Sequence, residues 1–186
     1  MPFPGNSPLP AIALARARLE LAHTFRIARS ADDFRETVIV RIEDGALEGF
    51  GEAAPSPRYG QSAESAERSL ASLPPSLFAA SESIGDAIDE AAERLGAEKA
   101  ALAAVDIALH DLAGKRAGTP LWRLLGLDPS RAPVTSYTIG IDEPEIVERK
   151  VREAADFPIL KIKMGLDNDR EILEAVRRVT SRPIRI

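Results

Sequence analysis

The sequence contains no cysteine, which removes disulfides, zinc–thiolate sites and cysteine nucleophiles from consideration. It has only two histidines, so a histidine-rich metal site is not expected. No apolar run approaches the roughly 20 residues that span a bilayer, so no membrane partner is predicted. The proline-rich leader at 1–10 lacks the basic and apolar regions of a secretory signal, so a cytoplasmic location is expected.

The charge balance also lacks a basic excess. The 24 lysines and arginines stand against 29 acidic residues, which gives a formal charge of −5. A nucleic-acid-binding protein usually carries a basic surplus, so no nucleic-acid partner is expected. Hydrophobic residues form 45% and charged residues 28% of the 186 residues, which is typical of a folded globular protein.

The first third of the chain has the pattern of a three-stranded antiparallel meander. Three segments alternate or are rich in β-branched residues, and they lie at 12–21, 37–43 and 46–53. Asp44-Gly45 is a hairpin turn signal between the last two, and a loop is expected at 23–33. Gly49 and Gly51 in the third strand indicate that another backbone approaches closely.

Helical spacing dominates the middle of the chain, and strands alternate with helices after Gly126. Helices are predicted at 62–72, 82–95 and 97–117, with a short helical turn at 121–125. Strands at 134–140, 159–164 and 183–186 then alternate with helices at 143–156 and 168–180. Strand–helix–strand units of this kind predict parallel pairing with right-handed crossovers. The fold class is therefore an α+β domain followed by the opening of an α/β domain.

The sequence stops on an apolar strand, which would leave a sheet edge unpaired. A closed eight-stranded barrel needs about 200 residues or more, and only the first strand–helix units are present. We therefore expect the amino-terminal portion of a longer protein. The alternative is a small open sheet that is complete as it stands.

The segment Leu160-Lys161-Ile162-Lys163-Met164 carries the sharpest chemical pattern. Alternate residues of a strand share a face, so the two lysines lie together, about 7 Å apart, opposite their apolar neighbours. Crowded, desolvated ammonium groups lose protons more readily, and a neutral lysine can act as a general base. The alternative interpretation is a solvated strand face, because Lys-x-Lys is short and common.

Two loops and one strand supply further candidates. Arg26 and Arg29 lie in the first loop and suit a carboxylate, and Tyr59 lies in the turn-rich segment PSPRYGQ. Thr135 and Tyr137 alternate on the first strand of the α/β part, and we expect them to face inwards with the lysines. Ordinary connections without chemistry are the alternative for both loops.

Taken in order, these pieces resemble the enolase superfamily, in its muconate-lactonizing branch. The resemblance spans the chain: the meander, Gly-Glu-Ala-Ala-Pro at 51–55, the helical stretch AALAAVDIALHDLAGKRAGTPLWRLLG at 100–126, and a barrel strand bearing Lys-Ile-Lys. The segments PSPRYGQS and TSYTIG are most similar to dipeptide epimerases, including those acting on L-Ala-D/L-Glu.

The resemblance implies an α+β capping domain over 1–130 and the first βα units of a (β/α) barrel over 131–186. It implies Mg²⁺ held by carboxylates of later barrel strands, the first just beyond Ile186, so no metal ligand is expected here. By the same resemblance Lys163 is the acid/base residue. The substrate-binding residues that it implies are Lys161, Thr135, Arg26, Arg29 and Tyr59.

The implied activity is that of a Mg²⁺-dependent dipeptide epimerase, which moves a proton at the α-carbon of a small carboxylate substrate. The 186 residues alone are then expected to be inactive. A muconate cycloisomerase and an o-succinylbenzoate synthase are the alternatives within the superfamily. A non-catalytic binding or assembly module is the alternative outside it, and a homo-oligomer is an open option.

Overall fold

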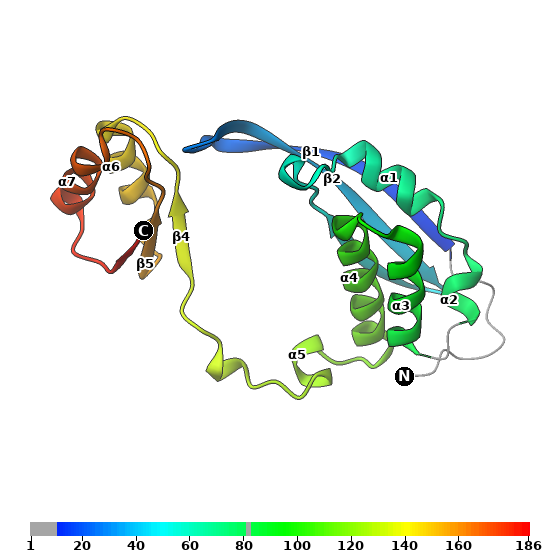
Figure 1. The fold of residues 1–186 in the computed structure, drawn as a ribbon. Coiled ribbons are helices and arrows are strands. Elements are labelled where there is room, and N and C mark those ends of the chain that lie inside the picture. The colour runs from blue at the N-terminus through cyan, green and yellow to red at the C-terminus, as the bar shows by residue number, and fades with distance from the viewer. Residues whose placement is uncertain (1–10, 81–82) are drawn as a thin grey trace. The chain divides into compact units, whose positions relative to one another are not determined.

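Two separate sheets organise the chain, an antiparallel one and a parallel one, in the computed structural model (Figure 1). The structure describes residues 11–80 and 83–186, so the expected leader at 1–10 lies outside the described residues. One compact unit comprises residues up to Leu19 together with Glu36–Pro129. The other comprises Glu20–Arg35 together with Ser130–Ile186.

The antiparallel sheet confirms the predicted meander. Its strands, in the order β1-β2-β3, are β1 (Ala11–Ile27), β2 (Ser30–Asp44) and β3 (Leu47–Ala53). The loop expected at 23–33 is wrong, because both strands continue through it to a turn at Ala28 and Arg29. Thr24 donates a hydrogen bond to Asp33 across the hairpin (Oγ1 to Oδ1, 2.6 Å), so polar side chains here pair with each other.

The helices that follow the first sheet are α1 (Ala63–Ala71), α2 (Ser76–Ala80), α3 (Ile84–Leu95), α4 (Lys99–Arg116) and α5 (Leu121–Leu124), and α4 packs on β3. Two single turns of 3₁₀ helix lie at Pro57–Tyr59 and Pro129–Arg131. The sequence pattern did not predict α2. Pro74-Pro75 ends α1 but also precedes α2, where a missing N–H costs nothing. No helix among the described residues is long and apolar enough to cross a bilayer.

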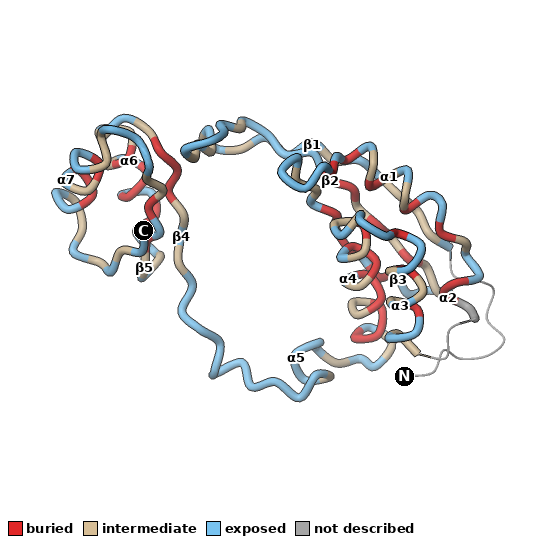
Figure 2. The backbone as a smooth tube through the Cα atoms, viewed as in Figure 1, coloured by how far each residue is buried: buried red, intermediate tan, exposed pale blue. Residues whose placement is uncertain are grey.

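The core of the first unit forms where α4 packs on β3. The side chains of Ala104 and Ala108 are fully buried, and Figure 2 shows the buried stripe along this helix. A Cβ atom added at Gly49 would lie 2.2 Å from the Ala108 carbonyl oxygen, and one at Gly51 would lie 1.9 Å from that of Ala104. The two glycines therefore let the helix backbone rest on the strand, as the sequence predicted.

The parallel sheet confirms the predicted strand–helix alternation. Its strands β4 (Ser136–Ile139), β5 (Ile159–Ile162) and β6 (Ile184–Arg185) lie in that order and are joined by α6 (Pro144–Glu153) and α7 (Asp169–Val179). One face packs on both helices through a buried cluster of Ile139, Val147, Val151, Ala154, Leu160, Ile162, Ile172 and Val176. The opposite face of the sheet is left to polar side chains.

Arg182 ties β6 to the carboxyl end of α6. Its guanidinium donates hydrogen bonds to the carbonyl oxygens of Ala154 (2.6 Å), Phe157 (2.6 Å) and Val151 (3.0 Å). The last carbonyls of a helix have no partner within the helix, and a cation there also complements the helix dipole. One side chain therefore closes the end of α6 and fixes the strand that follows.

Replacing Arg182 by Met is expected to lower the free energy of unfolding by about 2 to 3 kcal/mol, because several carbonyl groups lose a charged donor. Urea unfolding followed by circular dichroism measures this loss. Arg170→Met is the matched control, since Arg170 is exposed on α7, and it should leave the midpoint unchanged. Equal midpoints for the two variants would contradict the capping role.

Candidate functional site

The uncovered face of the parallel sheet carries both lysines of the Lys-Ile-Lys motif. Leu160 and Ile162 point into the helix-covered core and are 0% and 1% exposed. Lys161 is exposed and Lys163 is half-buried on the other face, as the strand period predicts. Lys163 lies just beyond the carboxyl end of β5, which is the edge where parallel α/β proteins bind their ligands.

The strand register places specific neighbours beside each lysine. Thr138 on β4 and Arg185 on β6 are the register partners of Lys161, so the three residues form a row across the sheet. The Lys163 amide donates a hydrogen bond to the Ile139 carbonyl (2.9 Å), which sets Lys163 one layer closer to the carboxyl ends. We call this surface the lysine face, and it comprises Thr138, Lys161, Lys163 and Arg185.

The expectation that Thr135 and Tyr137 face inwards with the lysines is wrong for Tyr137. Tyr137 is the register partner of Leu160, and its ring lies against Phe157 with centroids 4.6 Å apart, on the helix side of the sheet. Thr135 precedes β4 and is exposed. Thr138 instead lies beside Lys161. Counting alternate positions from the buried Ile139 would have found it, because that count puts Thr138 on the opposite face.

The hairpin tip at Glu20–Arg35 lies against the carboxyl ends of β4 and β5, within the same unit. The Arg26 carbonyl accepts a hydrogen bond from the Ile141 amide (2.9 Å). A Cβ atom at Gly140 would lie 3.0 Å from the Arg26 backbone, and one at Gly165 would lie 3.2 Å from the Ala28 Cβ. The structure therefore brings the segment with Arg26 and Arg29 to the edge where Lys163 lies.

Polar side-chain contacts lie at the base of this hairpin tip and in the segment beside it. His23 Nε2 lies 2.6 Å from Glu153 Oε2 on α6. Lys150, only 5% exposed, pairs with Asp142 at 3.0 Å. Burial raises the pKa of Asp142, but Lys150, the Glu143 amide and the charge of Arg26 outweigh it and hold that pKa below its usual value. A cavity of about 310 Å³ lies here, lined by residues of β1, Arg35, β4, Gly140 and Lys150.

Tyr59 lies in the other unit, on the 3₁₀ turn Pro57–Tyr59, and its side chain is 74% exposed. This turn ends at Gly60, whose φ of 70° suits glycine. The turn carries an exposed phenol at the start of the segment that leads into α1, as the motif PSPRYGQ suggested.

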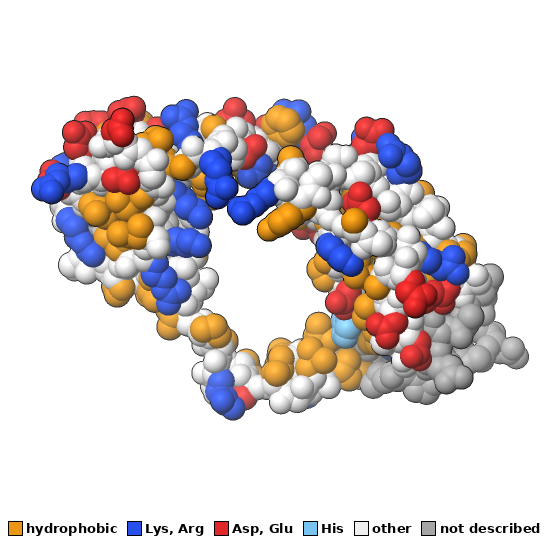
Figure 3. Space-filling view, viewed as in Figure 1, with side chains coloured by type: hydrophobic (Ala, Val, Ile, Leu, Met, Phe, Trp, Pro, Cys, Tyr) orange, Lys and Arg blue, Asp and Glu red, His pale blue; other side chains and the backbone are white. Residues whose placement is uncertain are grey.

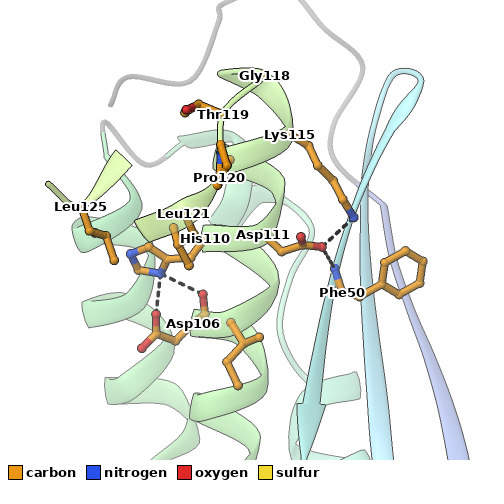
Figure 4. Close-up of a pocket in the computed structure, with 12 residues that line it drawn as sticks. Phe50, Asp106, His110, Asp111, Lys115, Gly118, Thr119, Pro120, Leu121 and Leu125 are labelled. Atoms are coloured by element: carbon orange, nitrogen blue, oxygen red, sulfur yellow. Dashed lines mark hydrogen bonds and ion pairs between the residues drawn. The ribbon is translucent and has the colours of Figure 1, made fainter. Parts of the chain in front are cut away.

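A larger cavity of about 990 Å³ lies in the first unit, beside α4 and α5 (Figure 4). Its polar groups already have partners. His110 Nδ1 lies 2.7 Å from Asp106 Oδ1, and Asp111 accepts hydrogen bonds from Lys115 Nζ (2.7 Å) and the Phe50 amide (2.8 Å). Burial raises the pKa of Asp111, whereas these two donors lower it, and the net result is a lowered pKa. The cavity therefore offers mainly apolar surface, and its two carboxylates, Asp106 and Asp111, already have partners.

The described residues do not fit a magnesium ion. Across 11–80 and 83–186, no group of three His, Asp or Glu side chains is placed to hold a metal. The lysine face presents cations, which are the wrong donors for Mg²⁺, since this ion prefers carboxylate and other oxygen ligands. In the unit that holds the parallel sheet, Figure 3 shows Lys and Arg side chains near β4 and Asp and Glu side chains over α6.

Comparison with known proteins identifies a matching protein family and a similar enzyme. Residues 12–126 match the mandelate racemase / muconate lactonizing enzyme family, N-terminal domain. The L-Ala-D/L-Glu epimerase of Bacteroides thetaiotaomicron is 39% identical over 169 residues, covering 90% of this chain and 44% of that protein. The chain therefore spans about half the length of this relative.

Two solved structures resemble the chain in the same way. The substrate-liganded L-Ala-D/L-Glu epimerase of Bacillus subtilis matches with a TM-score of 0.78 and 28% identity, over 94% of this chain and 51% of that one. The dipeptide epimerase of Enterococcus faecalis V583, complexed with Mg and L-Leu-L-Tyr, matches with a TM-score of 0.73 and 29% identity, over 91% and 50%. Both proteins share the enolase-type arrangement of a meander with helices followed by parallel strand–helix units.

Proposed function

The chain belongs to the mandelate racemase/muconate lactonizing enzyme family, and on that premise we propose that it is part of a dipeptide epimerase. We place the capping domain at 1–130 and the first barrel units at 131–186, which the division of the chain after Pro129 supports, while the hairpin tip Glu20–Arg35 groups with the second unit. The observation that carries the proposal is the lysine face. It sets two ammonium groups side by side at the ligand-binding edge of a parallel sheet.

The chemistry follows from this placement. The α-proton of an amino acid residue is weakly acidic, so its removal needs a base beside the α-carbon and a cationic surrounding for the enediolate that forms. Lys163 takes or returns the proton on one side of the α-carbon. Lys161, one layer deeper, holds the substrate carboxylate by charge-assisted hydrogen bonds. A second base on the other side completes the inversion, and we place it outside these residues.

Magnesium is included in the proposed function because a related enzyme binds it, and not because the described residues of this chain could hold it. The Enterococcus faecalis epimerase is complexed with Mg, whereas the described residues hold no ligand set for it. We propose that carboxylates outside these 186 residues hold Mg²⁺ in the whole protein. When bound, such an ion stabilises negative charge on a substrate oxygen.

The proposal is tested by incubating the intact protein with L-Ala-L-Glu and Mg²⁺ in D₂O and following the glutamate α-proton by NMR. We expect the proton to exchange and the L-Ala-D-Glu isomer to appear. No exchange from any dipeptide would overturn the proposal. The epimerase names of the relatives favour this reaction over a muconate cycloisomerase or an o-succinylbenzoate synthase.

Substrate preference should depend on the hairpin tip and the Tyr59 turn. We propose that Arg26, Arg29 and Tyr59 bind the side chain of the substrate and that Thr135 contacts another part of it. Arg26→Ala and Tyr59→Ala are expected to change the ratio of kcat/KM between acidic and apolar dipeptides by about tenfold or more. α-Proton exchange on the best remaining substrate should change much less.

Steady-state assays on a panel of dipeptides measure this ratio. Tyr59→Phe is the matched control for the phenol, because it keeps the ring and removes only the hydroxyl. If Arg26→Ala and Tyr59→Ala leave the ratio unchanged, these residues have no part in selecting the substrate.

A further inference from the structure

Arg185 is a third cation on the lysine face, and the sequence motifs do not single it out. Its neighbour Ile184 is the register partner of Leu160 and packs against the helix-side core. Because successive strand residues point to opposite faces, the Arg185 side chain belongs on the face of Lys161, its own register partner. Adjacent strands lie about 4.8 Å apart, so the two cationic side chains leave the backbone as close neighbours.

None of the ion pairs within the part of the chain that the structure describes involves the cations of this face. No acidic side chain in residues 11–80 or 83–186 forms an ion pair with Lys161, Lys163 or Arg185. A lysine can lose its proton, but a guanidinium stays charged at any pH that a protein tolerates. Arg185 therefore keeps a permanent positive charge beside Lys161, and this surface is suited to an anion.

We propose that Arg185 binds the carboxylate of the substrate, together with Thr138 and Lys161. This inference rests on the proposed epimerase function and names a residue for it. The guanidinium presents two parallel N–H groups that match the two oxygens of a carboxylate. The Thr138 hydroxyl donates from the other side of Lys161. Three donors from three neighbouring strands then hold the carboxylate, while Lys163, one layer nearer the strand ends, remains available for proton transfer.

This arrangement makes the face selective for anions. A neutral amide in place of the carboxylate would leave the three donors with weaker acceptors and the two cations without a counter-charge. Arg185 is thus a binding residue and does not itself move a proton. Replacing Arg185 should therefore weaken substrate binding more than it lowers the rate at which bound substrate reacts.

The experiment compares Arg185→Gln, Arg185→Lys and the control Arg170→Gln in the intact protein. Arg170 is exposed on α7, so its replacement removes one charge from the same unit without touching the lysine face. For Arg185→Gln we expect KM for L-Ala-L-Glu to rise about tenfold or more, with a smaller change in kcat. KM should also depend less on salt concentration, because one fixed charge is missing. The KM of Arg185→Lys should lie between that of the wild-type protein and that of Arg185→Gln.

A second measurement separates this inference from the proposed reaction. Equilibrium binding of succinate, a carboxylate with no stereocentre, should weaken in Arg185→Gln and stay unchanged in Arg170→Gln. If wild type epimerises dipeptides but Arg185→Gln keeps its KM and salt dependence, the carboxylate role is refuted and the reaction stands. If wild type shows no exchange but succinate binding still requires Arg185, the anion site stands and the reaction is refuted. Should Arg185→Gln fail to fold, Arg185→Lys with an unaltered KM would refute the role.

Discussion

Replacing Lys163 by Ala in the intact protein should abolish epimerisation in both directions. Each direction needs one group that removes the α-proton and one that supplies a proton to the opposite side, and Lys163 is proposed for one side only. The variant should still exchange the α-proton of one isomer with solvent, because the base on the other side is intact. The expected loss of epimerisation is about a thousandfold or more, within the usual range for a general acid–base residue.

NMR in D₂O, run separately from each pure isomer, measures epimerisation and exchange together. Lys163→Arg serves as a control for charge, since a guanidinium keeps the positive charge but cannot act as a base. It should be as inactive as Lys163→Ala. If Lys163→Ala epimerises at a rate near wild type, or loses exchange equally from both isomers while folded, the assignment of Lys163 to one side of the substrate is wrong.

The largest expected loss of stability comes from Gly51→Ala. The added methyl group would lie 1.9 Å from the Ala104 carbonyl oxygen and 2.9 Å from the Ala108 nitrogen, and both are backbone atoms of α4. Relief requires the whole helix to move away from β3, because no flexible side-chain end can yield. We expect the free energy of unfolding to fall by about 3 kcal/mol or more, at or beyond the upper end for overpacked cores.

Gly85→Ala is the matched control, because it makes the same chemical change in the first turn of α3. There the nearest atom to an added Cβ is the Ser83 Oγ at 3.6 Å, an ordinary contact. Alanine favours the helix over glycine, so this variant should be unchanged or more stable by up to about 1 kcal/mol. Urea midpoints of the two variants should therefore move in opposite directions or differ widely. Similar midpoints would show that α4 does not rest on Gly51.

Periodicity predicted most elements because each has one buried face. The predicted helix at 97–117 corresponds to α4 (Lys99–Arg116), and the predicted strand at 159–164 contains β5 (Ile159–Ile162). The predicted loop at 23–33 is wrong although Phe25 and Ile27 alternate with Thr24 and Arg26, because none of its residues is fully buried and its second half is mostly polar. Cross-strand pairs such as Thr24 with Asp33 become visible only in the structure.

The sequence predicts which residues of one strand share a face, but it does not predict which residues of the neighbouring strands lie beside them. Alternation alone put Lys161 and Lys163 on one face. Which residues of β4 and β6 lie beside them depends on the register, and a shift of one residue exchanges the two faces. For this reason the sequence did not identify Thr138 and Arg185 as the neighbours of Lys161 on β4 and β6.

The β1–β2 hairpin restricts how the length of this sequence can vary over evolution. The part of β1 up to Leu19 and the part of β2 from Glu36 belong to the first unit, whereas the tip, Glu20–Arg35, belongs to the second. Losing one residue from a single arm would turn every later side chain of that arm to the other face, including Arg26. Insertions and deletions should therefore survive only as matched changes in both arms or as changes in the turn at Ala28 and Arg29. In a set of homologous sequences, gaps in these arms should come in compensating pairs, whereas gaps elsewhere in surface loops need no partner.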